Sequence, residues 1–344
     1  MKAGAAIDDG KSQDGSLPAI CHVVPYLDTG GMERIVESML TEFTRRGHKM
    51  CLFCTDREGD LFATACAVAK VCGDRRRRPL TIDWRVVGSL KRFIRENGVG
   101  ILHAHNFLAQ MHSVLAAIGS DAKVVTTIHG QTYFLTKRLH YLQKLLAWRT
   151  FRIVCVSEDV SKTAVGRRCC RPAKLAVIRN GIRCDHLQQR PDVQVSSVRQ
   201  RLGIPAGAFV AGSVGRFAVV KNYPLLVKAF ARMMKNSMFQ QSAVHSPKPT
   251  LLIVGDGPDR PDIERTIAEC GIADSVVLPG MQVDVEPWLA AMDVFCLSSL
   301  TEGTSISLLE AGAAGLPAVV TDVGGNSEVI EAGITGFLVP DADE

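Results

Sequence analysis

The 344-residue chain is 47% hydrophobic and 22% charged, a balance that supports two globular domains and argues against a disordered or fibrous protein. No apolar run approaches the ~18–20 residues of a membrane-spanning helix, and residues 1–16 are expected to be a flexible tail rather than a signal peptide. Residues 1–184 carry 29 basic against 16 acidic residues (net +13), whereas residues 185–344 carry 11 against 19 (net −8), so the first half is expected to face an anionic partner.

The 11 cysteines predict neither disulfides nor a zinc site. Without a secretory signal, reduced thiols are expected. Cys51 and Cys54 form a C-x-x-C pair, but residues three apart on a strand point to opposite faces, and no second pair follows at ligand spacing. We expect most of the cysteines to be small core residues.

The first half alternates short apolar strands with helices. A strand at 19–27 leads through the turn "DTGG" into a helix, whose apolar residues recur on one face from Ile35 to Phe43. Residues 45–47 ("RRG") are expected to end this helix, since cations suit the negative end of the dipole and glycine suits a C-cap. Further strands are predicted at 48–56, 100–105, 123–130 and 152–159.

The second half repeats this pattern after a polar joint at 186–206. Asn222 is predicted to cap a helix that has Pro224 in its first turn. Strands are predicted at 209–217, 250–257, 275–280, 293–299 and 317–325. Because strands that alternate with helices form parallel sheets, the sequence predicts two doubly wound, Rossmann-like α/β domains, 17–188 and 189–344, whose strand ends face each other across a cleft.

Polar and glycine-rich clusters follow five of the predicted strands. They are "DTGG", "HAHN", "TIHG", "GRFAVVKN" and "SSLTEGTS". Ligands of doubly wound sheets bind at the carboxyl ends of the strands. We therefore expect these clusters to converge on one site.

Two clusters of the second half suit phosphate. Arg216 and Lys221 lie on one loop before a helix N-terminus, where they would add to free backbone N–H groups and the positive end of the dipole, although an exposed pair on a solvated loop is an equal alternative. Gly303, Thr304 and Ser305 form a second candidate anion cradle, with a hydroxyl available to cap the next helix. A pyrophosphate between the two cradles would be bound from both sides.

Two glutamates lie eight positions apart around the second cradle. Glu302 follows a strand and Glu310 lies inside the next helix, so their separation is expected to exceed the ~5–9 Å of paired hydrolase carboxylates. A carboxylate accepts hydrogen bonds well from vicinal hydroxyls, as in dinucleotide-binding folds. The spacing therefore favours two sugars joined by a pyrophosphate, as in a nucleotide-sugar.

Nine stretches carry a family resemblance along about residues 20–340: "GGMERIVESMLTEFTRRGHKM", "ILHAHN", "TIHG", "VCVSED", "VIRNGI", "GSVGRFAVVKN", "IVGDGP", "VVLPG" and "EGTSISLLEAGAAGLPAVVTDVGGNSEVI". "GSVG" and "GDG" are weak evidence alone, whereas Glu-x7-Glu followed by "GLPAVVTDVGG" is strong. Together, in this order, they resemble glycosyltransferase family 4, retaining enzymes with the two-domain GT-B fold.

The resemblance implies transfer of a sugar from a nucleotide-sugar, a UDP- or GDP-sugar, to a glycan or lipid-linked acceptor, as in polysaccharide or glycolipid biosynthesis. It implies retention of configuration by front-face attack, with no cofactor and no bound metal. Nucleic acid is not an expected partner. An anionic membrane surface is a further expected partner, and the expected location is cytoplasmic and peripheral to the inner face of the cell membrane.

The resemblance also implies roles for the second-half residues. Glu310 would hold the ribose hydroxyls, and Glu302 would contact the donor sugar beside the reacting carbon. Arg216 and Lys221 would bind the pyrophosphate and stabilise charge on the leaving group.

The remaining implied site residues come from both halves. The N–H groups of the second anion cradle would face the sugar or the phosphates, Gly30 and Gly31 would close over the donor, and His129 would lie near the transferred carbon. Thr304 and Ser305 stand where many family members carry a bulkier aromatic residue and a proline, which leaves the donor's identity open.

The family resemblance also bears on the end of the sequence. Family members continue past the "GFLVP" region into closing helices, whereas only residues 341–344 follow it here. The resemblance thus implies a truncated second domain. Low turnover and limited stability are expected for residues 1–344, because apolar surface that the missing helices would cover stays in water.

Two stretches of the first half allow more than one interpretation. His103 and His105 form an H-x-H pair on one face of a strand, but no third ligand is evident at suitable spacing, which favours hydrogen-bonded cleft or core histidines over a metal site. Residues 133–152 carry five cations and no acid, which fits either a membrane-surface helix or an amphipathic helix packed on the sheet.

Two other function classes compete with a transferase. A nicotinamide-dependent dehydrogenase is disfavoured, because neither "GSVG" nor "GDGP" completes G-x-G-x-x-G at a strand–helix turn. A non-catalytic or degraded nucleotide-sugar-binding paralogue would carry the same motifs, so only turnover separates it from an enzyme.

Overall fold

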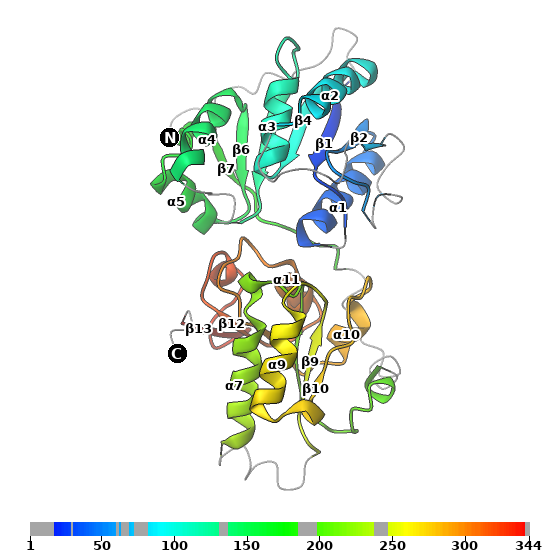
Figure 1. Cartoon of the computed structure of the whole chain (residues 1–344), viewed down its shortest axis with the longest axis vertical. Coiled ribbons are helices and arrows are strands. Elements are labelled where there is room, and N and C mark those ends of the chain that lie inside the picture. The colour runs from blue at the N-terminus through cyan, green and yellow to red at the C-terminus, as the bar shows by residue number, and fades with distance from the viewer. Residues whose placement is uncertain are drawn as a thin grey trace. The chain divides into compact units, whose positions relative to one another are not determined.

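The computed structural model describes residues 17–28, 30–59, 62, 69–71, 82–130, 137–184, 198–236 and 247–340. The chain divides into two compact units, Met1–Ile178 and Arg179–Glu344 (Figure 1). The expected tail at 1–16, the expected domain boundary at 188–189 and the last four residues, 341–344, lie outside the described residues.

The first unit is built on a seven-stranded sheet of order β3-β2-β1-β4-β5-β6-β7, with every neighbouring pair parallel. Its strands are β1 (Ala19–Val24), β2 (Met50–Cys54), β3 (Ala69–Val71), β4 (Val99–His105), β5 (Lys123–Ile128), β6 (Arg152–Cys155) and β7 (Leu175–Val177). Its helices are α1 (Gly31–Arg45), α2 (Trp84–Asn97), α3 (Phe107–Ala116), α4 (Lys137–Arg149), α5 (Glu158–Gly166) and the short η3 (Pro172–Lys174).

Successive residues of the central strands enter different cores, as a pleated strand covered on both faces requires. Cys21 and Cys51 pack with the apolar faces of α2 and α3, whereas Val24 and Cys54 pack with α1. The two cysteines of the C-x-x-C pair thus point to opposite faces, as predicted. No disulfide links the cysteines that the structure describes.

The second unit has a six-stranded parallel sheet of order β10-β9-β8-β11-β12-β13. Its strands are β8 (Val210–Val214), β9 (Thr250–Val254), β10 (Val276–Val277), β11 (Val294–Leu297), β12 (Ala318–Thr321) and β13 (Gly336–Val339). Its helices are α7 (Tyr223–Lys235), α9 (Arg260–Cys270), α10 (Glu286–Ala290) and α11 (Ile306–Ala313), with single turns η4 (Val219–Lys221), η5 (Ala273–Ser275) and η6 (Asn326–Glu328).

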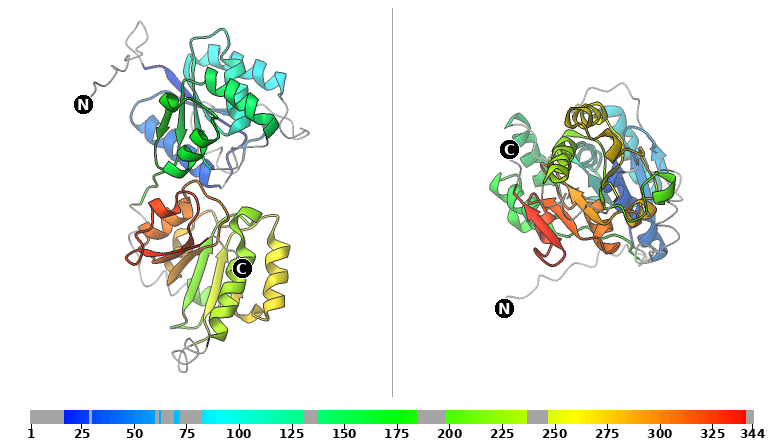
Figure 2. Two further views of the ribbon diagram at one scale, coloured as in Figure 1. Left: turned by 90° about the vertical axis from the view of Figure 1, so that its left-hand side faces the viewer. Right: turned by 90° about the horizontal axis from the view of Figure 1, so that it is seen from below.

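The helices of the second unit cover both faces of its sheet. Helices α7 and α9 lie side by side (Figure 2) and pack on Leu251 and Ile253 of β9, whereas α11 packs on the face that carries Leu252 and Val254. The predicted fold class, two doubly wound Rossmann-like α/β domains, is therefore confirmed. Among the described helices, none has both the length and the apolar character to cross a membrane.

Two local predictions for the second half need correction. The later part of the expected polar joint belongs to the second core, because Val198 and Ile204 are buried there and Arg199 pairs with Asp293 at 3.0 Å. Asn222 stands at the N-cap of α7 but makes no side-chain cap. Its backbone is left-handed (φ 48°), because it also ends the η4 turn, and asparagine tolerates that conformation.

Candidate active site

An ion pair joins the two loops that leave the neighbouring strands β8 and β11. Nζ of Lys221 lies 2.6 Å from Oε1 of Glu302, and the hydroxyl of Ser299 donates to the same carboxylate oxygen at 2.6 Å. The Lys221 and Glu302 side chains are 18% and 11% exposed, so water screens the pair only in part. Because β8 and β11 are hydrogen-bonded neighbours, their carboxyl ends bring together residues 81 positions apart.

Hydrogen bonds to backbone carbonyls fix the separation of these two loops. The hydroxyl of Ser298 donates to the carbonyls of Lys221 (2.9 Å) and Asn222 (3.0 Å). The N–H of Leu300 donates to the carbonyl of Val220 at 2.8 Å. The ammonium and the carboxylate are therefore held by main-chain geometry as well as by their mutual attraction.

Arg216 projects from the same loop as Lys221 and is exposed. The "GDG" glycines support its loop: a Cβ at Gly255 would collide with the carbonyl oxygen of Gly215, and one at Gly257 with that of Phe217. Both glycines also have positive φ, at 148° and 156°. The "GDG" motif, which alone is weak evidence of function, determines how closely the loop after β9 approaches the backbone on both sides of Arg216.

The second anion cradle is buried at the start of α11. Ser305 is the N-cap residue, and its hydroxyl accepts from the N–H of Leu308 at 3.4 Å, as predicted for this position. The carbonyl of Gly303 accepts from the N–H of Gly325 at 2.7 Å, and that of Thr304 from the Asn180 amide at 3.4 Å. Neighbouring loops therefore hold residues 303–305 in place.

Glu310 lies within α11 and is partly buried, whereas Glu302 lies in the loop before that helix. The two glutamates are thus on different elements, as predicted. Gly324, with φ 59°, packs so tightly on the backbone of Glu302 that a side chain there would collide with it. This explains a glycine in "DVGG" and links that motif to the position of the Glu302 carboxylate.

Gly30 and Gly31 lie where β1 leads into α1 in the first unit. Gly30 is the N-cap residue in an extended conformation, and Gly31 begins the helix without a side-chain cap. Nearby, Arg57 forms a bidentate ion pair with Asp28 and lies over the ring of Tyr26, 4.4 Å from its centroid. This clamp joins the loops after β1 and β2, and no sequence pattern indicated it.

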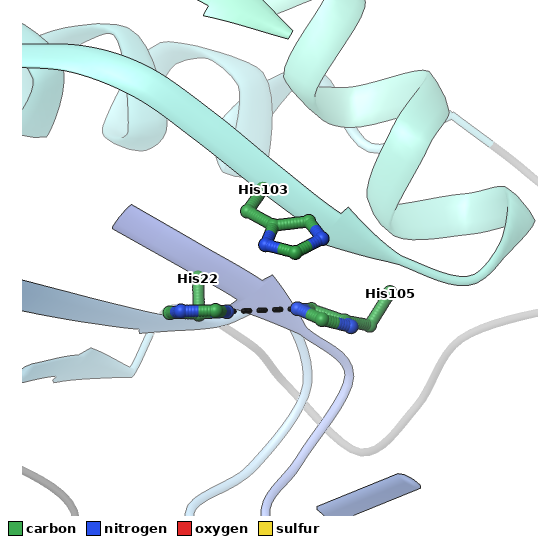
Figure 3. Close-up of side chains that lie close together, drawn as sticks. All are labelled: His22, His103 and His105. Atoms are coloured by element: carbon green, nitrogen blue, oxygen red, sulfur yellow. Dashed lines mark hydrogen bonds between the residues drawn. The ribbon is translucent and has the colours of Figure 1, made fainter. Parts of the chain in front are cut away.

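Four histidines share one face of the first sheet. His22 on β1 lies opposite His103 on β4, His105 is two residues farther along β4, and His129 follows β5. Nδ1 of His22 lies 2.8 Å from Nε2 of His105 (Figure 3), and Nδ1 of His105 lies 2.9 Å from Nε2 of His129. His22 thus supplies the third histidine that was not evident at suitable spacing in the sequence. The burial of His22 and His105 agrees with the predicted core position of these side chains.

Burial keeps all four imidazoles neutral. It lowers the pKa of His103 from 6.5 to about 4 and that of His129 to about 3. Burial, with a smaller effect of the neighbouring imidazoles, also lowers the pKa values of His22 and His105 well below 6.5. Within the described residues, the nitrogens of His22, His103 and His105 form the one cluster that is compact enough to hold a metal ion, all within 4.8 Å of one another.

The structure thus divides the predicted site residues between the two units. Arg216, Lys221, Glu302 and Glu310 lie with the cradle on two neighbouring loops and one helix of the second unit. Gly30, Gly31 and His129 lie at strand ends of the first unit. Sequence reasoning missed His22 because one histidine inside the apolar run "AICHVVPYL" gives no signal until its neighbouring strand is known.

Two family models match the chain. "Glycosyltransferase Family 4" matches residues 29–186, and "Glycosyl transferases group 1" matches residues 208–344. Between them, they contain every residue of the predicted site.

The chain is also similar to known bacterial proteins. It is 27% identical over 266 residues to UDP-Gal:alpha-D-GlcNAc-diphosphoundecaprenol alpha-1,3-galactosyltransferase of Escherichia coli, covering 75% of this chain and 66% of that protein. It is 30% identical to N-acetyl-alpha-D-glucosaminyl L-malate synthase of Bacillus anthracis, covering 74% of this chain and 65% of that protein. The matched part thus spans slightly less than two thirds of either relative.

Solved structures share the fold. Anabaena Alr3699/HepE in complex with UDP and glucose superposes with a TM-score of 0.80 at 21% identity, covering 94% of this chain and 86% of that one. Sucrose-phosphate synthase of Thermosynechococcus elongatus gives a TM-score of 0.75 at 18% identity, covering 95% and 87%.

Proposed function

The chain belongs to glycosyltransferase family 4, and from this membership we propose that it is an enzyme that transfers a sugar from a nucleotide-sugar to a glycan or lipid-linked acceptor. The observation that carries the proposal is the Lys221–Glu302 pair, held beside the buried cradle at the start of α11. A cation and a helix N-terminus at the carboxyl end of a parallel sheet are suited to bind a diphosphate. By its name, the Escherichia coli relative transfers galactose from UDP-galactose to a sugar on diphosphoundecaprenol, which supports this reaction class. The Bacillus anthracis relative is named for joining an N-acetylglucosaminyl group to L-malate, which supports glycosyl transfer in general.

In the proposed mechanism, Lys221 and Arg216 bind the diphosphate and stabilise the charge that develops on it as the bond between the sugar's anomeric carbon and the phosphate oxygen breaks. An ammonium has three N–H donors, so Lys221 can keep its bond to Glu302 and still donate to phosphate oxygens. The two cations supply the electrostatic stabilisation that a metal ion supplies elsewhere. EDTA is accordingly expected to leave the transfer rate unchanged, and loss of activity that magnesium or manganese restores would contradict this step.

Glu310 is proposed to accept hydrogen bonds from the ribose hydroxyls, and Glu302 to contact the donor sugar beside the reacting carbon. N–H groups of Gly303, Thr304 and Ser305 would bind the sugar or its phosphates. Gly30 and Gly31 at the start of α1 would close over the donor, and His129 would contact the sugar. Retention of configuration by front-face attack requires no covalent intermediate, which fits a site whose carboxylate is already paired with an ammonium.

We also propose that the protein works at the cytoplasmic face of an anionic membrane. One side of α4 is buried, while the other exposes Tyr141 (78%), Leu145 (59%) and Trp148 (62%). Lys144 and Arg149 are exposed on that same side. The helix therefore combines both interpretations of this stretch, since it packs on the unit and presents a basic apolar surface suited to lipid.

The decisive experiment is incubation of the protein with UDP-, GDP- and ADP-sugars and with lipid-diphosphate acceptors, following nucleotide release and product formation. Acceptor-dependent release from one donor is expected, and NMR of the product should show the anomeric configuration of the donor retained. Nucleotide-sugar binding without turnover would instead indicate the non-catalytic paralogue. Reduction of NAD or NADP with a hydroxy substrate would contradict the proposal altogether.

A further inference from the structure

Three of the four histidines on the first sheet form a continuous hydrogen-bonded chain. Its order is His22 on β1, His105 on β4 and His129 after β5, with nitrogen–nitrogen distances of 2.8 and 2.9 Å. His103 lies beside this chain, 4.3 Å between ring centroids from His105, but its Nε2 bonds instead to the hydroxyl of Thr127 at 2.7 Å. Both ring nitrogens of His105 therefore form hydrogen bonds with other histidines, Nε2 with His22 and Nδ1 with His129.

The neutral state of these rings limits where the protons of the chain can lie. A neutral imidazole carries one N–H and one acceptor nitrogen. Three neutral rings share three protons, and each of the two ring–ring bonds holds one of them. The third proton must therefore lie at one end of the chain, either on Nε2 of His22 or on Nδ1 of His129.

The surroundings of the two ends distinguish these arrangements. Nε2 of His22 is buried and has no hydrogen-bond partner among the described residues. Buried N–H groups without an acceptor are rarer in proteins than buried acceptor atoms without a donor. His129, in contrast, is partly exposed at the end of β5, where its N–H can meet water or a ligand. The arrangement that leaves Nε2 of His22 without a proton is therefore favoured.

We infer that His22 and His105 are positioning residues that hold His129 in its Nδ1–H tautomer, so that His129 presents a hydrogen-bond donor to the substrate. In this arrangement Nδ1–H of His22 donates to His105, and Nδ1–H of His105 donates to Nε2 of His129. The assigned partner of His129 is an oxygen of the bound sugar that accepts a hydrogen bond, such as the oxygen of a hydroxyl group. This identification of the partner rests on the proposed function, whereas the tautomer does not.

The same geometry disfavours a metal ion in the cluster. Two imidazoles on one tetrahedral zinc, at 2.0–2.1 Å each, place their nitrogens about 3.3 Å apart. Nδ1 of His22 and Nε2 of His105 are 2.8 Å apart, a separation typical of a hydrogen bond. Among the described residues, the cluster that could hold a metal ion consists of histidines alone, with no carboxylate to offset the charge of a buried divalent cation.

The test is a two-bond 1H–15N correlation spectrum of the full chain labelled with 15N-histidine, at pH 7 and without ligand. His129, assigned by its absence in His129→Gln, should show a protonated Nδ1 and an unprotonated Nε2. A protonated Nε2 on either His129 or His22 would overturn the inference. This readout needs no turnover, so it stands even if the sugar-transfer proposal fails.

Two variants distinguish the hydrogen-bonded histidines from the neighbouring His103. His105→Phe keeps a ring of similar size but removes both bonds, so His129 should show a mixture of tautomers, and transfer should slow about tenfold. His103→Phe removes a histidine whose ring also lies against His105, at 4.3 Å between centroids, but which is outside the hydrogen-bonded chain, so it should leave the His129 tautomer unchanged. An unchanged His129 spectrum in folded His105→Phe would contradict the inference, as would binding of one zinc ion per chain that either His22→Phe or His103→Phe abolishes.

Discussion

The histidine face of the first unit and the Lys221–Glu302 loops of the second occupy equivalent places, at the carboxyl ends of neighbouring parallel strands. The histidine face is neutral, whereas the loops carry an ion pair. The histidines lie on the strands or directly after them, so pleating and cross-strand register bring them together and packing buries them. Lys221 and Glu302 lie on loops beyond their strands, where they form an ion pair that is partly exposed to water. In this protein, the buried strand ends of the first unit thus carry neutral hydrogen-bonding imidazoles, and the partly exposed loops of the second unit carry charged side chains.

The difference follows from the free energy of desolvation. A charged group deep in a sheet would lose its hydration without compensation, so the buried imidazoles lose their protons instead. On the loops, Ser299 and the ammonium of Lys221 replace part of the water around the carboxylate. We therefore expect the two regions to differ in which step of catalysis they affect and in how they respond to pH.

The largest effect should come from the charged region. Lys221→Ala is expected to lower kcat about 10²–10³-fold, because it removes a donor aimed at developing negative charge. Lys221→Arg, which keeps the positive charge, should lower kcat less than Lys221→Ala does. Lys228→Ala, on the exposed side of α7, is the matched control and should keep the rate. Steady-state kinetics showing the same loss for both alanine variants would remove the distinction between site and surface.

A second change tests binding in the same unit. Glu310→Ala should weaken nucleotide affinity, since each hydrogen bond to a charged acceptor contributes about 1.5–3 kcal/mol. Isothermal titration with UDP and GDP measures this effect. Glu331→Ala, an exposed glutamate of the same unit, serves as the control. Unchanged affinity in the Glu310 variant would refute the proposed ribose contact.

Acid should destabilise the first unit more than the second. The folded pKa values of His103 (about 4) and His129 (about 3) lie below the ordinary 6.5, so the unfolded chain binds more protons in this window. The stability of the first unit should therefore fall as the pH drops from 6.5 towards 4, by up to about 1.4 kcal/mol per pH unit for each histidine.

Hydrogen exchange with mass spectrometry at pH 7 and pH 5, corrected for intrinsic rates, reports each unit separately. Peptides of β1 and β4 should lose protection before those of β8 and β9. His103→Phe should reduce the pH dependence in the first unit, because one neutral histidine is gone. Simultaneous loss of protection in both units would show that the buried histidines do not determine acid sensitivity.

The smallest expected effect concerns the surface of α4. Trp148→Ser and Leu145→Ser should weaken sedimentation with anionic vesicles, and Lys144→Ala should lower affinity by about 1 kcal/mol at low salt. Trp84→Ser removes a tryptophan that is 67% exposed on α2 and is the control. Equal binding to neutral and anionic vesicles would rule out an electrostatic contribution.

Sequence patterns predicted most of the fold, because apolar periodicity and turn residues are local properties. The expected strands and helices occur close to their predicted positions, and Ser305 caps α11 as its position suggested. Asn222 shows the limit of this reasoning, since its side chain suits a cap but the preceding turn imposes a left-handed backbone instead. The residues predicted to bind phosphate could be chosen from the sequence because they lie on loops that follow predicted strands.

The sequence by itself determined the two α/β domains, the family, and the charged residues of the loops, all of which are encoded within short stretches. Only the tertiary structure decided that His22 completes the histidine chain, that Ser299 supports the Lys221–Glu302 pair, and that the "GDG" glycines pack on the Arg216 loop. The physical reason is that sheet order and register, set by packing of the whole unit, choose which distant strands become neighbours. A single histidine in an apolar strand carries no local signal of function, and its hydrogen bond to a second imidazole exists only because the sheet order places the two strands side by side.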